Sequence, residues 1–299
     1  MTAVLCIGSV LWDVIGRSAS VMRQGSDVPG RITQIPGGVA LNIAMTLVRF
    51  GLRPALLSAV GRDVLGDVLV SECRDMGLET GFLYRSEDLP TDRYMAVEGA
   101  NGLIAAIADA HSLEAAGDKI LRPLQDGRLG SKAAPFEGLI ALDGNLTEHL
   151  LAQIARDPAF SAADLRVAPA SPGKAERLLP FLSRSFDSTG AVLYVNCEEA
   201  GILCQTEFAD AETAAQALVA RGALRALVTD GGALCADADG AGVVSERPPE
   251  VLVTRVTGAG DTFMAAHMAA ELAGQDRAAA LKSALTAAAR YVSGETPHD

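Results

Sequence analysis

The stretch TRVTGAGDTF, residues 254–263, decides how the rest of the chain is interpreted. Its composition predicts a strand-like run that breaks into a glycine turn and then opens a helix. Gly258 and Gly260 can adopt backbone dihedrals that are closed to other residues, so successive N–H groups can converge on one anion in front of the helix dipole. The turn therefore predicts an anion-binding site.

Asp261 follows that turn directly. A carboxylate repels a phosphate and is unsuited to passive phosphate binding, but it suits a general base that removes a proton from an attacking hydroxyl group. The alternative is an ordinary helix cap, because Asp is a preferred N-cap residue. The motif alone is compatible with both interpretations.

Composition limits the classes of function. The chain has 299 residues, 49% of them hydrophobic, which is enough for one large core or for a core with a small appendage. A net charge of −12 argues against a surface for nucleic acid polymers. The five cysteines form no C-x-x-C pair, which predicts neither a zinc site nor a disulfide framework and fits a reducing compartment. With no apolar run long enough to cross a bilayer, we expect a cytoplasmic protein without a membrane partner.

Polar residues near the first apolar run are candidates for ligand binding. Asp13 follows this run, at the position where open α/β sheets keep their ligands, although a solvated turn is the alternative. Gly37 and Gly38 precede an amphipathic helix predicted over 40–50 and permit close approach of a ligand. Asn42, one helical turn in, can donate and accept hydrogen bonds to a polyol.

Two short regions predict a second, smaller sheet. Residues 31–35 have the pattern of a half-exposed strand, and the Asn-Gly pair at 101–102 separates two strand-like runs, which is a strong hairpin signal. Together they would form a sheet over the region of Asp13 and Gly38, and such an appendage is typical of a lid. The alternative is an extension of the main sheet.

The remainder alternates strands and helices, which favours a doubly wound, largely parallel sheet with right-handed crossovers. We expect strands over 3–10, 56–61, 139–143, 165–168, 191–196 and 223–229. We expect helices over 146–156, 174–183, 198–204, 211–221, 261–274 and 277–293. The carboxyl edge of the sheet then collects polar and glycine residues: Asp143, Asn145, Asn196, Glu199, Thr229 and Gly231.

Several common nucleotide and hydrolase signatures are missing from the sequence. It contains no G-x-x-x-x-G-K-[ST] loop, no G-x-G-x-x-G after the first strand, no H-E-x-x-H and no G-x-S-x-G. P-loop ATPases, dinucleotide oxidoreductases, zinc hydrolases and serine hydrolases are therefore disfavoured.

The whole chain resembles the ribokinase-like (PfkB) family of carbohydrate and nucleoside kinases. The resemblance rests on GGVALNIA at 37–44 and VTGAGDTF at 256–263, with NCEE at 196–199 matching the family's N-x-x-E. It implies a ribokinase-like doubly wound α/β domain, residues 1–12, 37–90 and 112–299, with a small β-sheet lid, residues 13–36 and 91–111. Within the family, the segments most similar to pseudouridine kinases are 29–32, 36–44, 57–63 and 143–145.

The resemblance implies a mechanism that agrees with the chemistry of the glycine turn. Asp261 would deprotonate a primary hydroxyl group of a nucleoside or sugar, with pseudouridine first, as its oxygen attacks the γ-phosphorus of ATP. The N–H groups of Gly258, Ala259 and Gly260 would stabilise the developing charge. Implied substrate-binding residues are Asp13, Gly37, Gly38, Asn42 and Asn145, and nucleotide-side candidates are Thr229, Gly231 and Thr257. Mg²⁺ would be held through phosphate oxygens and water, with Glu199 and Asn196 in its outer shell.

Four residues depart from the family pattern, and one of them, Ala266 in place of a usual helix glycine, is expected to change only packing. Arg255 stands where the family often has an acidic or polar residue, which places a bound monovalent cation in doubt. Leu234 replaces an expected glycine, and Ala168 stands where relatives commonly carry Asp. A second hypothesis is therefore a catalytically weak sugar- or nucleoside-binding member of the fold; a ribokinase- or fructokinase-type enzyme is a further alternative.

The exposed edge of the lid would allow a homodimer.

Overall fold

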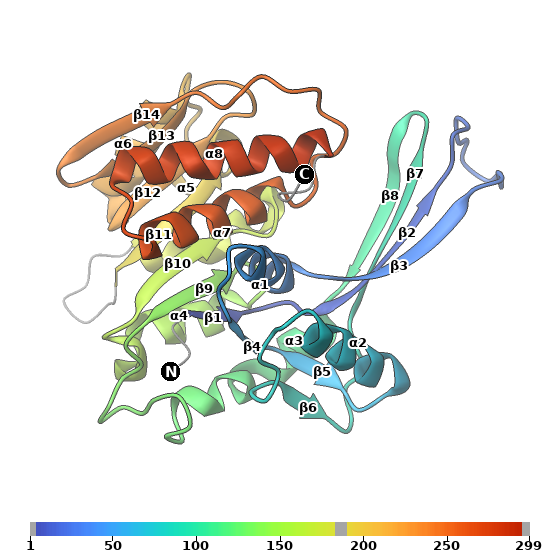
Figure 1. Cartoon of the computed structure of the whole chain (residues 1–299), viewed down its shortest axis with the longest axis horizontal. Coiled ribbons are helices and arrows are strands. Elements are labelled where there is room, and N and C mark those ends of the chain that lie inside the picture. The colour runs from blue at the N-terminus through green and yellow to red at the C-terminus, as the bar shows by residue number, and fades with distance from the viewer. Residues whose placement is uncertain (1–3, 183–189, 295–299) are drawn as a thin grey trace.

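The computed structural model of the protein describes residues 4–182 and 190–294 (Figure 1). Its centre is an eight-stranded sheet in the order β14-β13-β12-β11-β10-β9-β1-β4. Six strands are parallel: β4 (Ala55–Leu57), β1 (Val4–Ile7), β9 (Leu139–Asp143), β10 (Asp164–Ala168), β11 (Ala191–Asn196) and β12 (Arg225–Thr229). Two antiparallel strands, β13 (Cys235–Asp239) and β14 (Gly242–Glu246), complete one edge. The predicted doubly wound, mostly parallel sheet is confirmed.

Helices cover both faces of this sheet because its strands are apolar on both sides. In β1, Leu5 and Ile7 belong to one hydrophobic core, whereas Val4 and Cys6 belong to the other. The second core also contains residues of α1 (Val39–Arg49), α2 (Val64–Asp75), α7 (Ala259–Leu272) and α8 (Arg277–Ser293). The first core is closed by α3 (His111–Ala116), α4 (Glu148–Arg156), α5 (Cys197–Cys204), α6 (Ala211–Arg221) and the 3₁₀ segments η1 (Gly117–Leu124), η2 (Pro158–Phe160) and η3 (Pro172–Leu182).

A separate four-stranded sheet extends from the main body beside α1 (Figure 1). Its order is β3 (Arg31–Gly37), β2 (Leu11–Arg17), β7 (Arg93–Gly99) and β8 (Gly102–Asp109). The hairpin predicted at Asn101-Gly102 joins β7 and β8, as expected. A two-stranded sheet, β5 (Ala59–Gly61) with β6 (Tyr84–Ser86), lies apart from both. The residue ranges assigned to a lid stay a prediction.

Two predicted strands are each divided between sheets. The strand expected over 3–10 ends at Ile7, and the chain enters the small sheet at Leu11 after a break at Gly8, whose φ is +151°. Asp13 thus lies beyond the carboxyl end of β1, as expected, but as the third residue of β2 in the small sheet and not in a turn. The strand expected over 56–61 is likewise divided at Ser58 into β4 and β5.

Other corrections concern irregular segments. Residues 254–256 form no strand, because the N–H groups of Thr254 and Arg255 donate to the carbonyl of Val292, 2.8 and 3.2 Å away at the end of α8, and not to a strand. The helix predicted over 174–183 is the 3₁₀ segment η3, which contains Pro180; Ser183 lies outside the described residues. Strands β13 and β14 were not predicted, because their short alternating sequences carry a weak signal.

Candidate active site

The two glycine-containing motifs, far apart in the sequence, meet at the N-termini of α1 and α7. The cap residue of α7 is Gly258, with φ +87° and ψ 0°, and Asp261 lies in the first turn. The cap residue of α1 is Gly38, with φ +99°, and Asn42 follows one turn later. The Asn42 Nδ2 donates to Asp261 Oδ2 at 2.9 Å. The carboxylate predicted to be a base and the amide predicted to bind a polyol are thus direct neighbours.

The environment of Asp261 favours its protonated form. Burial raises the pKa of this carboxyl group, the hydrogen bond from Asn42 lowers it, and the nearby carboxylates of Asp143 and Asp13 raise it; together these effects bring it to about 7. A carboxyl group with a pKa near neutrality can take up and release a proton under physiological conditions. Perturbed titration in a polar cluster is the expected signature of a functional site.

The turn before Asp261 offers open hydrogen-bond donors. In the described part of the chain, the N–H groups of Gly258, Gly260 and Asp261 have no hydrogen-bond partner. The N–H of Ala259 donates to the carbonyl of Val256 at 3.0 Å, so in this conformation it is occupied and differs from the expected open donor. The Thr257 carbonyl is also engaged, because it accepts a hydrogen bond of 2.9 Å from the Tyr291 hydroxyl of α8.

Asp13 and the two glycines of the first motif form the adjoining wall. Burial raises the pKa of Asp13 to about 6. A Cβ atom on Gly37 would lie 2.1 Å from Asp13 Oδ2, and one on Gly38 would lie 2.6 Å from the carbonyl oxygen of Ser9. Neither position therefore accepts a side chain without moving its neighbour, and the predicted close approach at these glycines is to protein atoms.

A buried network under the site was largely missed at the sequence level. Asp143 is fully buried at the end of β9 and accepts hydrogen bonds from Ser9 N (2.7 Å), Ser9 Oγ (2.5 Å) and Asn145 N (2.7 Å). Ser9 Oγ in turn accepts from Val39 N, the first residue of α1, at 2.9 Å. Asn145 is held by Lys174, whose Nζ donates to Asn145 Oδ1. The sequence signals were a serine and an aspartate at the ends of two buried runs.

The predicted outer-shell pair at α5 forms a capping box. Asn196 Oδ1 accepts from Glu199 N at 2.8 Å, and Glu199 Oε2 accepts from Asn196 N at 2.9 Å. Burial raises the pKa of Glu199 to about 7. Across residues 4–182 and 190–294, no group of three or more His, Cys, Asp or Glu side chains could hold a metal ion. A role for this pair beside a metal stays a prediction.

The predicted nucleotide-side residues lie at the same sheet edge. Thr229 ends β12 and pairs in register with Asn196 of β11. Gly231, with φ +54°, lies in the exposed turn from β12 to β13. Leu234 directly precedes β13, and Ala168 is the last residue of β10.

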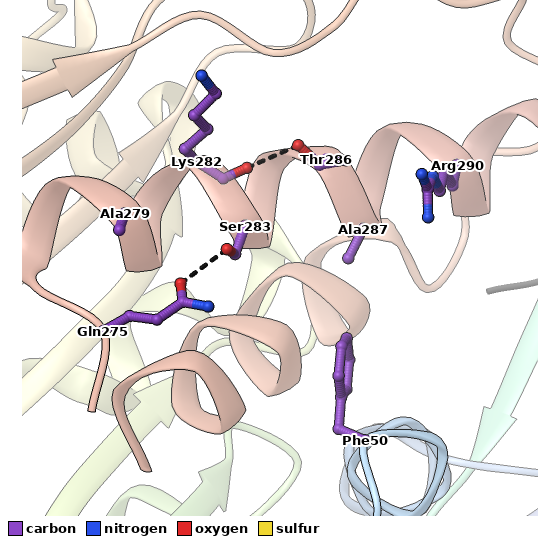
Figure 2. A pocket seen from close by; sticks show the side chains of 8 residues that line it. All are labelled: Phe50, Gln275, Ala279, Lys282, Ser283, Thr286, Ala287 and Arg290. Atoms are coloured by element: carbon purple, nitrogen blue, oxygen red, sulfur yellow. Dashed lines mark hydrogen bonds between the residues drawn. The ribbon is translucent and has the colours of Figure 1, made fainter. Parts of the chain in front are cut away.

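The groove drawn in Figure 2 lies elsewhere. It has a volume of about 470 Å³ and runs along α8 past Phe50 at the end of α1. None of the predicted site residues lines it. Two of its hydroxyl groups are already engaged, because Ser283 Oγ donates to Gln275 Oε1 and Thr286 Oγ1 to the Lys282 carbonyl, each at 2.8 Å. The cluster around Asp261 stays the candidate active site.

Comparison with known proteins identifies the family. The profile described as pfkB family carbohydrate kinase matches residues 1–296. The chain belongs to the PfkB family. It is accordingly a kinase, a transferase that acts on a sugar or nucleoside.

Within the described ranges, none of the helices has the length and apolar character needed to span a bilayer.

Individual relatives of this PfkB kinase differ in their named substrates. The chain is 28% identical over 268 residues to the uncharacterized sugar kinase YeiI of Escherichia coli, covering 87% of this chain and 69% of that protein. It is 32% identical over 152 residues to the pseudouridine kinase of Escherichia coli, covering 50% of this chain and 47% of the relative, so the match spans about half of that protein. Arabidopsis thaliana ribokinase, solved with ribose and ATP, shares the fold with a TM-score of 0.77 at 19% identity, covering 97% of this chain and 92% of that one.

Proposed function

We propose that this PfkB kinase transfers the γ-phosphoryl group of ATP to a primary hydroxyl group of a nucleoside or sugar, with pseudouridine, converted to pseudouridine 5′-phosphate, as the first candidate. The observation that carries the proposal is Asp261, a carboxyl group with a pKa of about 7 beside the open N–H groups of Gly258 and Gly260. A base and an anion-binding turn in direct succession suit phosphoryl transfer to an alcohol.

Each residue then has a chemical task. The substrate oxygen forms its bond to the γ-phosphorus while the bond from that phosphorus to ADP breaks, and the hydroxyl proton passes to Asp261. Asn42 holds the carboxylate in place through its 2.9 Å hydrogen bond. Asp13 and Asn145 would bind hydroxyl groups of the substrate, with Gly37 and Gly38 shaping the wall. The open N–H groups would stabilise charge on the phosphoryl oxygens, and each such donor is commonly worth about 3 kcal/mol in the transition state.

ATP and Mg²⁺ fit the donors that are present. Open backbone N–H groups at a helix N-terminus suit a phosphate, and Thr229, Gly231 and Thr257 would line the nucleotide side. Mg²⁺ neutralises charge on transferring phosphates when bound. Because the described residues offer no cluster of three metal-binding side chains, it would be held through phosphate oxygens and water, with Glu199 and Asn196 in the outer shell.

Arg255 supports activity without a monovalent cation. Its guanidinium group already lies over the ring of Tyr291, 3.9 Å from the centroid, beside the anion-binding turn. We therefore propose that exchanging K⁺ for tetramethylammonium at constant ionic strength leaves the rate unchanged. A rate that requires K⁺ would contradict this.

The small sheet would act as a lid and as a dimer surface. Asp13 lies in β2, so movement of this sheet would carry a substrate-binding residue with it. β8 is an edge strand on which Leu103 and Ile107 are 60% and 67% exposed. We propose a homodimer through this edge, which sedimentation analysis would test.

All five cysteines are unpaired, which supports the expected cytoplasmic location.

The experiment that tests the proposed function is a product screen. The purified protein, ATP and MgCl₂ are incubated with pseudouridine, ribose, adenosine, fructose or ketodeoxygluconate, and phosphorylated products are detected by mass spectrometry. We expect pseudouridine 5′-phosphate. Phosphorylation of ribose or fructose instead would favour a ribokinase- or fructokinase-type enzyme. Calorimetric binding of a compound without any product would favour a catalytically weak binding protein.

A further inference from the structure

The last turn of α8 lies against the residues that lead into the anion-binding turn. Thr254 N and Arg255 N donate to the Val292 carbonyl at 2.8 and 3.2 Å, and Thr254 Oγ1 donates to the same oxygen at 3.1 Å. Carbonyl groups in the last turn of a helix lack partners within the helix, so they are available to such donors. The approach to the turn is thus attached to the end of α8.

The side chain of Arg255 continues this attachment. Its Cζ lies 3.9 Å from the centroid of the Tyr291 ring, and its Nε donates to the Tyr291 carbonyl at 2.7 Å. A guanidinium group combines stacking on an aromatic face with directional hydrogen bonding, which a lysine ammonium group cannot do in the same way. Arg255 therefore holds both the ring and the backbone of Tyr291.

Tyr291 in turn holds one peptide group of the anion-binding turn. Its hydroxyl donates to the Thr257 carbonyl at 2.9 Å. Because a trans peptide group is planar, the Thr257 carbonyl and the Gly258 N–H point in opposite directions. Fixing that carbonyl on Tyr291 directs the Gly258 N–H away from α8. The packing is tight, since a Cβ atom on Gly258 would lie 2.5 Å from Tyr291 Oη.

We infer that Arg255 and Tyr291 form a positioning pair that directs the Gly258 N–H at the transferring phosphoryl group. The inference rests on the proposed function of the turn in phosphoryl transfer. Neither side chain would touch the substrate, because both act through the Thr257–Gly258 peptide group. The pair also gives a role to Arg255, which the family pattern left without one.

The test uses Tyr291→Phe, which removes the hydroxyl group and keeps the ring under Arg255. Complete loss of one such donor lowers kcat by about 10²–10³-fold. A misdirected N–H group can still stabilise some of the charge, so we expect a smaller fall in kcat of about tenfold. Affinities for ADP and for the substrate identified in the screen stay unchanged in calorimetry. Aluminium fluoride bound together with ADP and substrate mimics the transferring phosphoryl group. We expect the affinity for this combination to fall about tenfold as well.

Arg255→Met provides the second variant, at an exposed side chain. We expect the same selective loss of kcat, and a double variant that loses less than the product of the two single effects, because both act through one carbonyl group. This variant carries the test if Tyr291→Phe does not fold.

Tyr84→Phe is the matched control. The Tyr84 ring also lies under cations, with Lys119 Nζ at 5.6 Å and Arg122 Cζ at 5.9 Å from its centroid, and its hydroxyl group forms no hydrogen bond with the rest of the described chain. It should leave kcat unchanged. Wild-type kcat and wild-type affinity for the aluminium fluoride complex in both Tyr291→Phe and Arg255→Met would overturn the inference and leave the proposed function standing. Absence of product from the wild-type enzyme would instead contradict the proposed function, and with it this role.

Discussion

The side-chain amide of Asn42 donates a 2.9 Å hydrogen bond to Asp261 Oδ2, joining the first turn of α1 to the first turn of α7. The bond stabilises the ionised form of a carboxyl group that burial would otherwise keep protonated. It also orients the carboxylate relative to the open N–H groups of the preceding turn. The geometry of this pair connects the two motifs on which the family resemblance rests.

The pH dependence of the reaction should report Asp261. A base must be deprotonated to act, so kcat/KM should rise with pH and level off above an apparent pKa near 7, the value to which burial raises this group. Asn42→Ala removes the hydrogen bond that favours the carboxylate, so the rising limb should move to higher pH. A pH–rate profile of both proteins provides the measurement, and an unshifted limb in the variant would argue against the pairing.

Gly37→Ala should disturb substrate binding through Asp13. The new Cβ would lie 2.1 Å from Asp13 Oδ2, so the carboxylate must move. Loss of a hydrogen bond to a charged group costs about 1.5–3 kcal/mol, which corresponds to about a 10- to 100-fold weaker substrate Kd. Gly16→Ala in the neighbouring strand is the control, because its nearest atoms would be 3.9 Å away. Equal affinities of the two variants by calorimetry would exclude Asp13 from binding.

Asp261→Asn should stabilise the fold at alkaline pH. The pKa of Asp261 is raised on folding from 3.8 to about 7, so the folded protein binds a proton that the unfolded chain has lost between those values. Stability of the wild type therefore falls as pH rises across that window. The side-chain amide of the Asp261→Asn variant does not titrate, so the variant does not lose stability in this way. We expect Tm of the variant to exceed that of the wild type by a few degrees at pH 8 and to match it near pH 4. A pH-independent difference in thermal melts would count against a buried, high-pKa carboxyl group.

A buried charge cluster behind α7 should contribute to stability. Asp237 is fully buried and contacts Arg225 at 2.5 Å and Arg277 at 3.0 Å. Asp237→Ala removes the carboxylate that Arg225 and Arg277 share, and leaves them Glu271 and Asp239 as partners. Since Asp237 is the fully buried member of this cluster, its loss should destabilise the protein by about 3 kcal/mol in urea unfolding. Glu98→Ala, which breaks the more exposed pair with Arg17, should change stability by less than about 1 kcal/mol. Similar losses in both variants would contradict the difference in burial.

Much of the main sheet could be predicted because its strands are continuous apolar runs between helices of clear period. Strands β9 and β11 have the predicted bounds, as do helices α6 and α8. The transfer of the chain to another sheet at Gly8 and Ser58 could not be predicted, because an apolar run does not indicate which neighbour its backbone pairs with. Only the tertiary contacts of the fold separate one strand from the next there.

The sequence indicates candidate site residues where a glycine, an amide or a carboxylate stands inside a motif, and their roles stay predictions. The sequence indicates Asp143 only as a residue at a sheet edge and gives no role to Ser9 or Lys174, since each depends on a partner more than 20 residues away. Arg255 could not be interpreted from the pattern alone, because its partner, Tyr291, lies 36 residues further along the chain. Long-range hydrogen bonds of this kind leave no local signal in a sequence.

The most direct test of the central claim is the rate of phosphoryl transfer by Asp261→Asn. Product is measured by mass spectrometry with saturating ATP, MgCl₂ and the substrate identified in the screen, while calorimetry follows substrate binding. Loss of a general base lowers the rate by about 10²–10⁴-fold, so we expect a loss in that range with substrate affinity and fold retained. Turnover near that of the wild type would contradict the assignment of Asp261 as the catalytic base.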